Sequence, residues 1–141
     1  MIRVPMRRLV TEYAATLVVM LALDSVWLSL TVPALYQPRL AEFLRPDPDL
    51  VAAILFYLLY AAGAVVFAVG PARDRSAIVA LGHGAFLGVV AYGTYDLTNQ
   101  ATLRGWPTLI TVLDIGWGAF LTGTAAAAAS WISGRWAGGR G

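Results

Sequence analysis

Three aspartates stand inside or at the edge of long apolar stretches of this 141-residue chain. Asp24 and Asp114 each precede a tryptophan by three residues, in LDSVW (23–27) and LDIGW (113–117). Asp96 lies in AYGTYDLTNQATL (91–103), where most side chains carry groups that can form hydrogen bonds. Carboxyl groups in apolar surroundings exchange protons or hold polar ligands, and such residues often mark function. Asp24, Asp96 and Asp114 are therefore the candidate catalytic residues.

Aromatic and amide side chains accompany these aspartates at helical spacing. At about 100° per residue, Tyr92, Asp96 and Asn99 share one helical face, and Asp24 shares another with Trp27. Such groups orient a polar headgroup and line an apolar channel. The candidate substrate-binding residues are Trp27, Tyr57, Tyr60, Tyr92, Tyr95, Asn99 and Trp117.

The remaining composition argues against several other chemistries. The chain has no cysteine and one histidine, which excludes thiolate chemistry and a multi-histidine metal site. We find no cofactor motif, so we expect neither a metal nor a cofactor. The net charge is only +2, and no basic cluster has the form of a nucleic-acid site, so we expect no nucleic-acid partner.

The chain is too apolar for a soluble domain. It is 59% hydrophobic and 13% charged, whereas soluble domains carry about 25% charged residues. A bilayer-spanning helix needs about 20 apolar residues, and four segments are long enough. We predict an all-α, integral membrane four-helix bundle that forms one domain over residues 1–141. The predicted spans are about 9–31, 51–69, 77–98 and 108–131.

Arginine placement predicts the orientation of these spans. Seven arginines lie in the two terminal segments and in 70–75, against three in the other two connections. Positively charged loops favour the cytoplasm, so both termini should be cytoplasmic. Pro33 and Pro38 should mark the end of the first helix, because proline interrupts a helix interior.

The aspartates should lie at a similar depth. At 1.5 Å per residue, Asp24 is about 10 Å below the outer boundary, and Asp114 and Tyr57 are about 9 Å below it. Asp96 should be shallower, near the outer end of its span. We therefore expect a polar pocket, shared by the bundle, that opens toward the outer side.

Purely structural interpretations stand beside this one. Asp96 and Asn99 fit a helix end that meets water. Asp24 and Asp114 fit hydrogen bonds that only pin helices together, with the indole three residues later donating to the carboxylate on the same helix. Glu12, close to two arginines in sequence, should be a solvated charge at the inner boundary.

Four segments carry a resemblance to a known family. These are LDSVWL (23–28), LFYLLYAAGAVVFAVGPA (55–72), TYDLTNQATL (94–103) and WPTLITVLDIGWG (106–118). Together they resemble a family of small bacterial membrane proteins known only as a domain of unknown function with four expected spans. The resemblance covers about residues 9–125 and implies the architecture, but no activity.

Three functions fit these residues. The first is the binding or processing of an amphiphilic, lipid-like molecule (fatty acyl, isoprenoid or carotenoid) in a bacterial inner membrane. The second is a structural or accessory membrane subunit, and the third is a small proton-coupled transporter. Membrane lipids are the expected partners, and a homo-oligomer is compatible with each function. Whether the chain is an enzyme stays open at this point.

Overall fold

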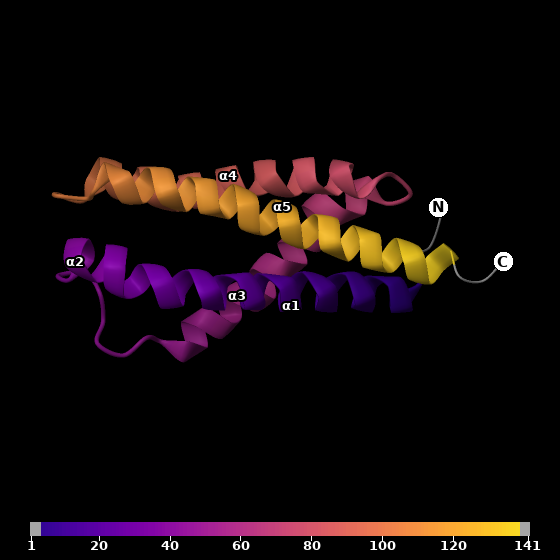
Figure 1. Ribbon diagram of the computed structural model, residues 1–141, viewed down its shortest axis with the longest axis horizontal. Coiled ribbons are helices and arrows are strands. Elements are labelled where there is room, and N and C mark those ends of the chain that lie inside the picture. The colour runs from indigo at the N-terminus through magenta and orange to yellow at the C-terminus, as the bar shows by residue number, and fades with distance from the viewer. Residues whose placement is uncertain (1–3, 139–141) are drawn as a thin grey trace.

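The computed structural model describes residues 4–138, and this part of the chain consists of helices and short connections without a strand. The helices form four rods (Figure 1), which confirms the all-α fold. The elements are α1 (Met6–Thr31), η1 (Val32–Tyr36), α2 (Gln37–Leu40), α3 (Leu50–Ala64), η2 (Val65–Val69), η3 (Gly70–Ala72), α4 (Ala77–Thr102) and α5 (Thr108–Gly138).

Each rod is long and apolar enough to cross a membrane, which confirms the four expected spans. They run over Met6–Leu40, Leu50–Ala72, Ala77–Thr102 and Thr108–Trp136. The start of α1 and the end of α5 lie at the same end of the bundle (Figure 1). Their cytoplasmic location stays a prediction, and two of the arginines behind it, Arg3 and Arg140, lie outside the described residues. We call the opposite end, with α2 and the connections 41–49 and 103–107, the distal end.

The first rod does not end at Pro33, contrary to the prediction. Residues Val32–Tyr36 form a π-helical turn in which the Gln37 N–H donates to the Val32 carbonyl, five residues back. The wider turn accommodates a proline, which has no N–H and whose ring clashes with a regular α-helical turn. Helix α2 then continues to Leu40. As a result, Tyr36 is carried on the helix to the distal end of the bundle.

Local sequence also fixes the two distal connections. Asp49 caps α3, because its carboxylate accepts a hydrogen bond from the Ala52 N–H at 3.1 Å. Gly105 has φ +75°, a left-handed conformation that glycine adopts without strain. Pro107 follows and precedes the first residue of α5.

Small residues bring α4 and α5 into close contact along their length. A Cβ on Gly88 would lie 2.0 Å from the Gly118 carbonyl oxygen, and one on Gly84 would lie 2.5 Å from the Thr122 carbonyl oxygen. In a bilayer there is no hydrophobic drive between helices, so close packing of small residues is a main source of helix association. These glycines therefore set the distance between α4 and α5.

An apolar layer crosses the middle of the bundle. Met20, Ala61, Leu121 and Ala125 are all fully buried and pack together, and they come from α1, α3 and α5. A second buried apolar cluster lies closer to the termini and includes Val69, Ala80 and Ala126. The two clusters separate the polar groups of the distal end from those near the termini.

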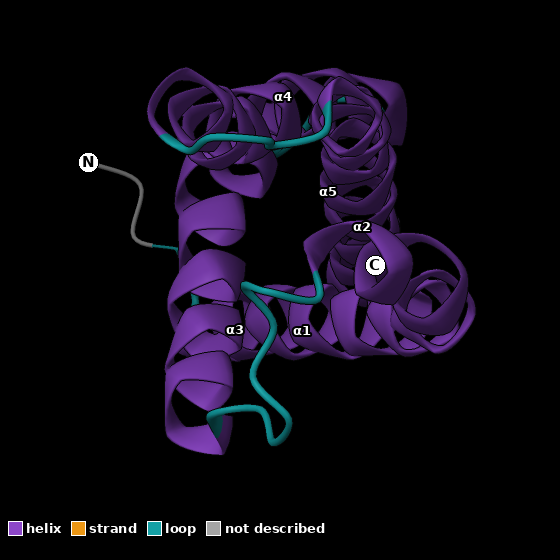
Figure 2. Cartoon of the chain, turned by 90° about the vertical axis from the view of Figure 1, so that its left-hand side faces the viewer, coloured by secondary structure: helices purple, strands orange, loops and turns teal. Residues whose placement is uncertain are grey.

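Helix α3 crosses the other helices obliquely (Figures 1 and 2). Its only buried residues are Ala61 and Ala64, in its second half. The leucines that precede these two alanines are exposed, with Leu50 at 70%, Leu55 at 62% and Leu59 at 77%. In a bilayer this part of α3 is therefore surrounded largely by lipid.

Gly88→Ala should destabilise the bundle, because its methyl group would force α4 and α5 apart. Overpacking of this kind costs about 1–3 kcal/mol. The matched control is Gly116→Ala on α5, where a Cβ meets nothing within 4 Å. Unfolding of both variants in mixed micelles measures the difference. Equal stability of the two variants would contradict the close contact.

Candidate functional site

A cavity of about 260 Å³ lies at the distal end of the bundle. All four rods contribute to its wall, and the wall includes all three candidate aspartates. The lining residues are Asp24, Trp27, Leu28, Tyr36, Phe56, Tyr57, Tyr92, Tyr95, Asp96, Asp114 and Trp117. The helices thus bring together residues that are distant in the chain. Asp24 and Trp117, for example, are 93 positions apart and hydrogen-bonded to each other.

Asp24 is buried, and each of its two carboxyl oxygens accepts a hydrogen bond from another helix. The Tyr57 hydroxyl donates to one carboxyl oxygen at 2.8 Å, and the Trp117 indole N–H donates to the other at 2.8 Å. The carboxyl is only 5% exposed. These bonds join α1 to α3 and to α5.

Asp114 accepts a hydrogen bond from the Tyr36 hydroxyl. That hydroxyl in turn accepts from the Trp27 indole N–H at 3.3 Å. The rings of Trp27 and Trp117 stack with their centroids 4.4 Å apart and an interplanar angle of 6°. The predicted bond from each indole to the aspartate of its own helix is therefore wrong. The stack between α1 and α5 directs each indole N–H to a different group of the cavity.

Asp96 has neither water access nor a protein partner. It is fully buried, and both of its carboxyl oxygens lack a hydrogen-bond partner within residues 4–138. The interpretation of a helix end in water is therefore wrong, because α4 continues to Thr102 and the side chain faces the cavity. A buried polar group without a partner is costly, so the free oxygens favour a bound donor.

Two of the predicted site residues lie outside the cavity wall. The Tyr60 hydroxyl is hydrogen-bonded to Thr122 at 2.8 Å, and its ring contacts Phe56 and Tyr92 behind the wall. Asn99 lies in the last turns of α4, where its carbonyl accepts from the Leu103 N–H. Tyr95 lines the cavity only at its rim, since it is 61% exposed.

Sequence reasoning missed three lining residues, Leu28, Tyr36 and Phe56. Tyr36 lies beyond Pro33, where the sequence predicts the end of the first helix. The sequence signal for Tyr36 was its spacing of nine residues from Trp27. This spacing indicates a shared site only if the helix continues past Pro33. Phe56 adjoins the predicted Tyr57, so its position was accessible from the sequence.

The cavity wall contains no arginine, lysine or histidine. Within residues 4–138, no group of three or more His, Cys, Asp or Glu side chains is placed to hold a metal ion. We therefore assign no metal to the three aspartates. The groups that a bound molecule meets are carboxyls, phenols and stacked aromatic rings.

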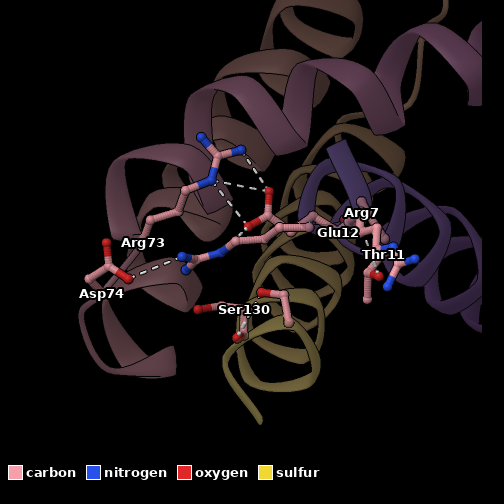
Figure 3. Close-up of polar contacts among 9 residues, drawn as sticks. Arg7, Thr11, Glu12, Arg73, Asp74 and Ser130 are labelled. Atoms are coloured by element: carbon pink, nitrogen blue, oxygen red, sulfur yellow. Dashed lines mark hydrogen bonds and ion pairs between the residues drawn. The ribbon is translucent and has the colours of Figure 1, made fainter. Parts of the chain in front are cut away.

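A second polar cluster lies near the termini (Figure 3) and corrects the expectation for Glu12. Glu12 is fully buried, and its carboxylate accepts from Arg8 at 3.1 Å and from Arg73 at 2.6 Å. Arg8 also pairs with the exposed Asp74 at 3.1 Å. The Glu12 carboxylate raises the pKa of the Arg73 guanidinium by hydrogen bonding to it. All charges in this cluster are paired, so we interpret it as a clamp between α1 and the connection to α4.

A larger cavity of about 750 Å³ lies between the start of α1 and the end of α5. Its polar lining is mostly engaged, because Ser133 donates to the Ser130 carbonyl and Arg8 pairs with Glu12. No carboxylate lines it. The distal cavity, with its unpaired buried carboxyl, is therefore the stronger candidate site.

Tyr57→Phe should weaken the fold, because it removes one of the two donors to the buried Asp24. An acceptor left unsatisfied costs about 1–3 kcal/mol. Tyr95→Phe is the matched control, since its exposed hydroxyl has no hydrogen bond within the described part of the chain. The free energy of unfolding in mixed micelles checks both variants. Tyr57→Phe as stable as its control would show that the bond to Asp24 is dispensable.

Comparison with known proteins agrees with the architecture. Residues 9–131 match the family model described as "Predicted membrane protein (DUF2177)". No curated protein and no solved structure matches the chain. The family match covers most of the chain, including every residue that lines the distal cavity. The chain therefore belongs to the DUF2177 family of membrane proteins.

Proposed function

We propose that this multi-pass membrane protein binds an amphiphilic, lipid-like molecule, whose polar head enters the distal cavity while its apolar chain stays in the bilayer. The observation that carries the proposal is Asp96, which is fully buried on the cavity wall without a protein partner. Fatty acyl, isoprenoid and carotenoid compounds are the classes considered. We place the protein in a bacterial inner membrane, with the cavity toward the outer leaflet.

The exposed rim of the cavity supports entry from lipid. Leu28 is 42% exposed, Phe56 is 45% exposed and Tyr95 is 61% exposed, although all three line the cavity. They come from α1, α3 and α4, and the first half of α3 is largely uncovered. In a bilayer these surfaces meet acyl chains. A molecule can therefore reach the cavity sideways from the membrane.

The size of the cavity supports a headgroup rather than a whole lipid. Pockets that enclose a drug-sized ligand measure about 300–1,000 Å³. The distal cavity, at about 260 Å³, is smaller. The apolar chain of the ligand would then lie on the exposed apolar surface of α3, where Leu55 and Leu59 face outward.

The three aspartates have different roles in this proposal. Asp24 and Asp114 already accept hydrogen bonds from phenol or indole groups and hold these groups in place. Asp96 has no such bond within residues 4–138, so we propose it as the carboxyl that contacts the ligand once the side chains that cover its oxygens move aside. If chemistry follows binding, Asp96 is the candidate acid or base. Membrane lipids are the proposed surroundings, and a homo-oligomer stays compatible with the exposed helix faces.

A structural or accessory subunit is the second candidate function. The bonds of Asp24 and Asp114 between helices favour it, because they account for both residues without a ligand. They leave Asp96 unexplained. The transporter has less support, because the apolar layer of Met20, Ala61, Leu121 and Ala125 lies between the distal cavity and the terminal end.

Mass spectrometry of molecules that copurify in mild detergent tests the proposal. We expect a defined lipid-like molecule with the wild type and its loss from Asp96→Leu at an unchanged melting temperature, because Asp96 has no protein bond to lose. Asp47→Asn in the exposed connection 41–49 is the control that keeps the molecule. An empty wild type, or equal retention by Asp96→Leu, would contradict the proposal and favour the structural role.

A further inference from the structure

Resting on the proposed function, the geometry points to a ligand head that donates hydrogen bonds and carries no negative charge, which means a hydroxyl or an amine. This inference follows from which donors, acceptors and charges the cavity wall leaves unused. It divides the considered amphiphiles into those with alcohol or amine heads and those with carboxylate or phosphate heads.

Charge is the first argument. The wall holds three carboxyl groups and no basic side chain. Charge interactions are stronger in a medium of low dielectric constant than in water. Protein sites for carboxylates and phosphates supply arginine, lysine or helix N-termini to compensate the charge. An anionic head in the distal cavity would lie beside Asp24, Asp96 and Asp114 without such compensation.

The hydrogen-bond inventory is the second argument. Tyr57 and Trp117 both donate to Asp24, while Tyr36 donates to Asp114. These donors are therefore unavailable to an anion. Within residues 4–138, both oxygens of Asp96 lack a donor, and Asp114 accepts a bond at one of its two oxygens only. In the described part of the chain, the donors that stay free on the wall are the phenols of Tyr92 and Tyr95, and neither is charged. The wall therefore suits a head that donates to a carboxyl better than it suits an anion.

Tyr92 provides the cavity with a hydrogen-bond donor for a hydroxyl head. Its ring lines the cavity, and its hydroxyl has no hydrogen bond within the described part of the chain. An alcohol can donate to Asp96, and the Tyr92 hydroxyl is a free donor elsewhere on the same wall. An amine likewise donates to Asp96, and its charge also favours the faces of the aromatic rings at Trp27 and Trp117. Both heads share the donated bond to Asp96.

Quenching of tryptophan fluorescence by brominated amphiphiles tests this inference. Trp106, Trp131 and Trp136 are replaced by phenylalanine, so that only Trp27 and Trp117 of the cavity report. The full-length protein is held in phosphatidylcholine nanodiscs. Four probes share one brominated alkyl chain and carry a hydroxyl, a primary amine, a carboxylate or a phosphate head, compared at equal concentration in the membrane.

We expect saturable quenching by the hydroxyl or the amine probe, with the anionic probes at least about tenfold weaker. Asp96→Leu should remove the saturable part, and Asp47→Asn should keep it. Asp96→Asn separates the two heads, because the amide keeps an acceptor but loses the charge. It should therefore retain the hydroxyl probe and lose the amine probe.

The outcomes separate this inference from the proposed function. A carboxylate or phosphate probe that binds as tightly as the others would overturn the inference and leave the binding site in place. No saturable quenching by any of the four probes would overturn the proposed function as well. Saturable binding of the hydroxyl or amine probe that survives in folded Asp96→Leu would show that Asp96 does not hold the head.

Discussion

Asp24 accepts hydrogen bonds from Tyr57 on α3 and from Trp117 on α5, so one buried carboxyl joins three of the four helices. A bilayer supplies no hydrophobic drive for helix association, so hydrogen bonds and close packing of small residues must provide it. Helix α4 is held by the second means, through the contact of Gly88 with Gly118. The polar face of α4 is hydrogen-bonded to α5 through Gln100, which donates to Thr108 at 3.3 Å, whereas Asp96 on that face has no partner within residues 4–138. Asp96, on that face, is consequently available to something other than protein.

The two LDxxW segments form a pair in space but not a symmetric one. Their indoles stack between α1 and α5, and each aspartate receives a phenol from elsewhere in the chain. Asp24 also receives an indole directly, whereas Trp27 reaches Asp114 only through Tyr36. The pair therefore builds a rigid aromatic wall. Asp96 has no counterpart in this arrangement. It supplies the cavity wall with a carboxyl group that has no partner within residues 4–138.

The sequence was sufficient for features that depend on local composition and period. The four spans follow from apolar length, and Thr111, Asp114 and Leu121 are buried on one face of α5 as helical spacing predicts. Features that depend on distant partners were not accessible. The burial of Glu12 requires Arg73, which is 61 positions away, and the role of Tyr36 requires a π-helical turn at Pro33. In both cases the decisive contact is tertiary, and local patterns suggested the opposite.

A structure determined in lipid nanodiscs tests the central claim most directly, because the claim concerns what occupies the space beside Asp96. The account predicts elongated density with its polar end about 3 Å from an Asp96 oxygen and its tail beside α3. Density of this kind should be present with native lipids and absent from Asp96→Leu. An Asp96 bonded to another side chain in a closed cavity would contradict the account.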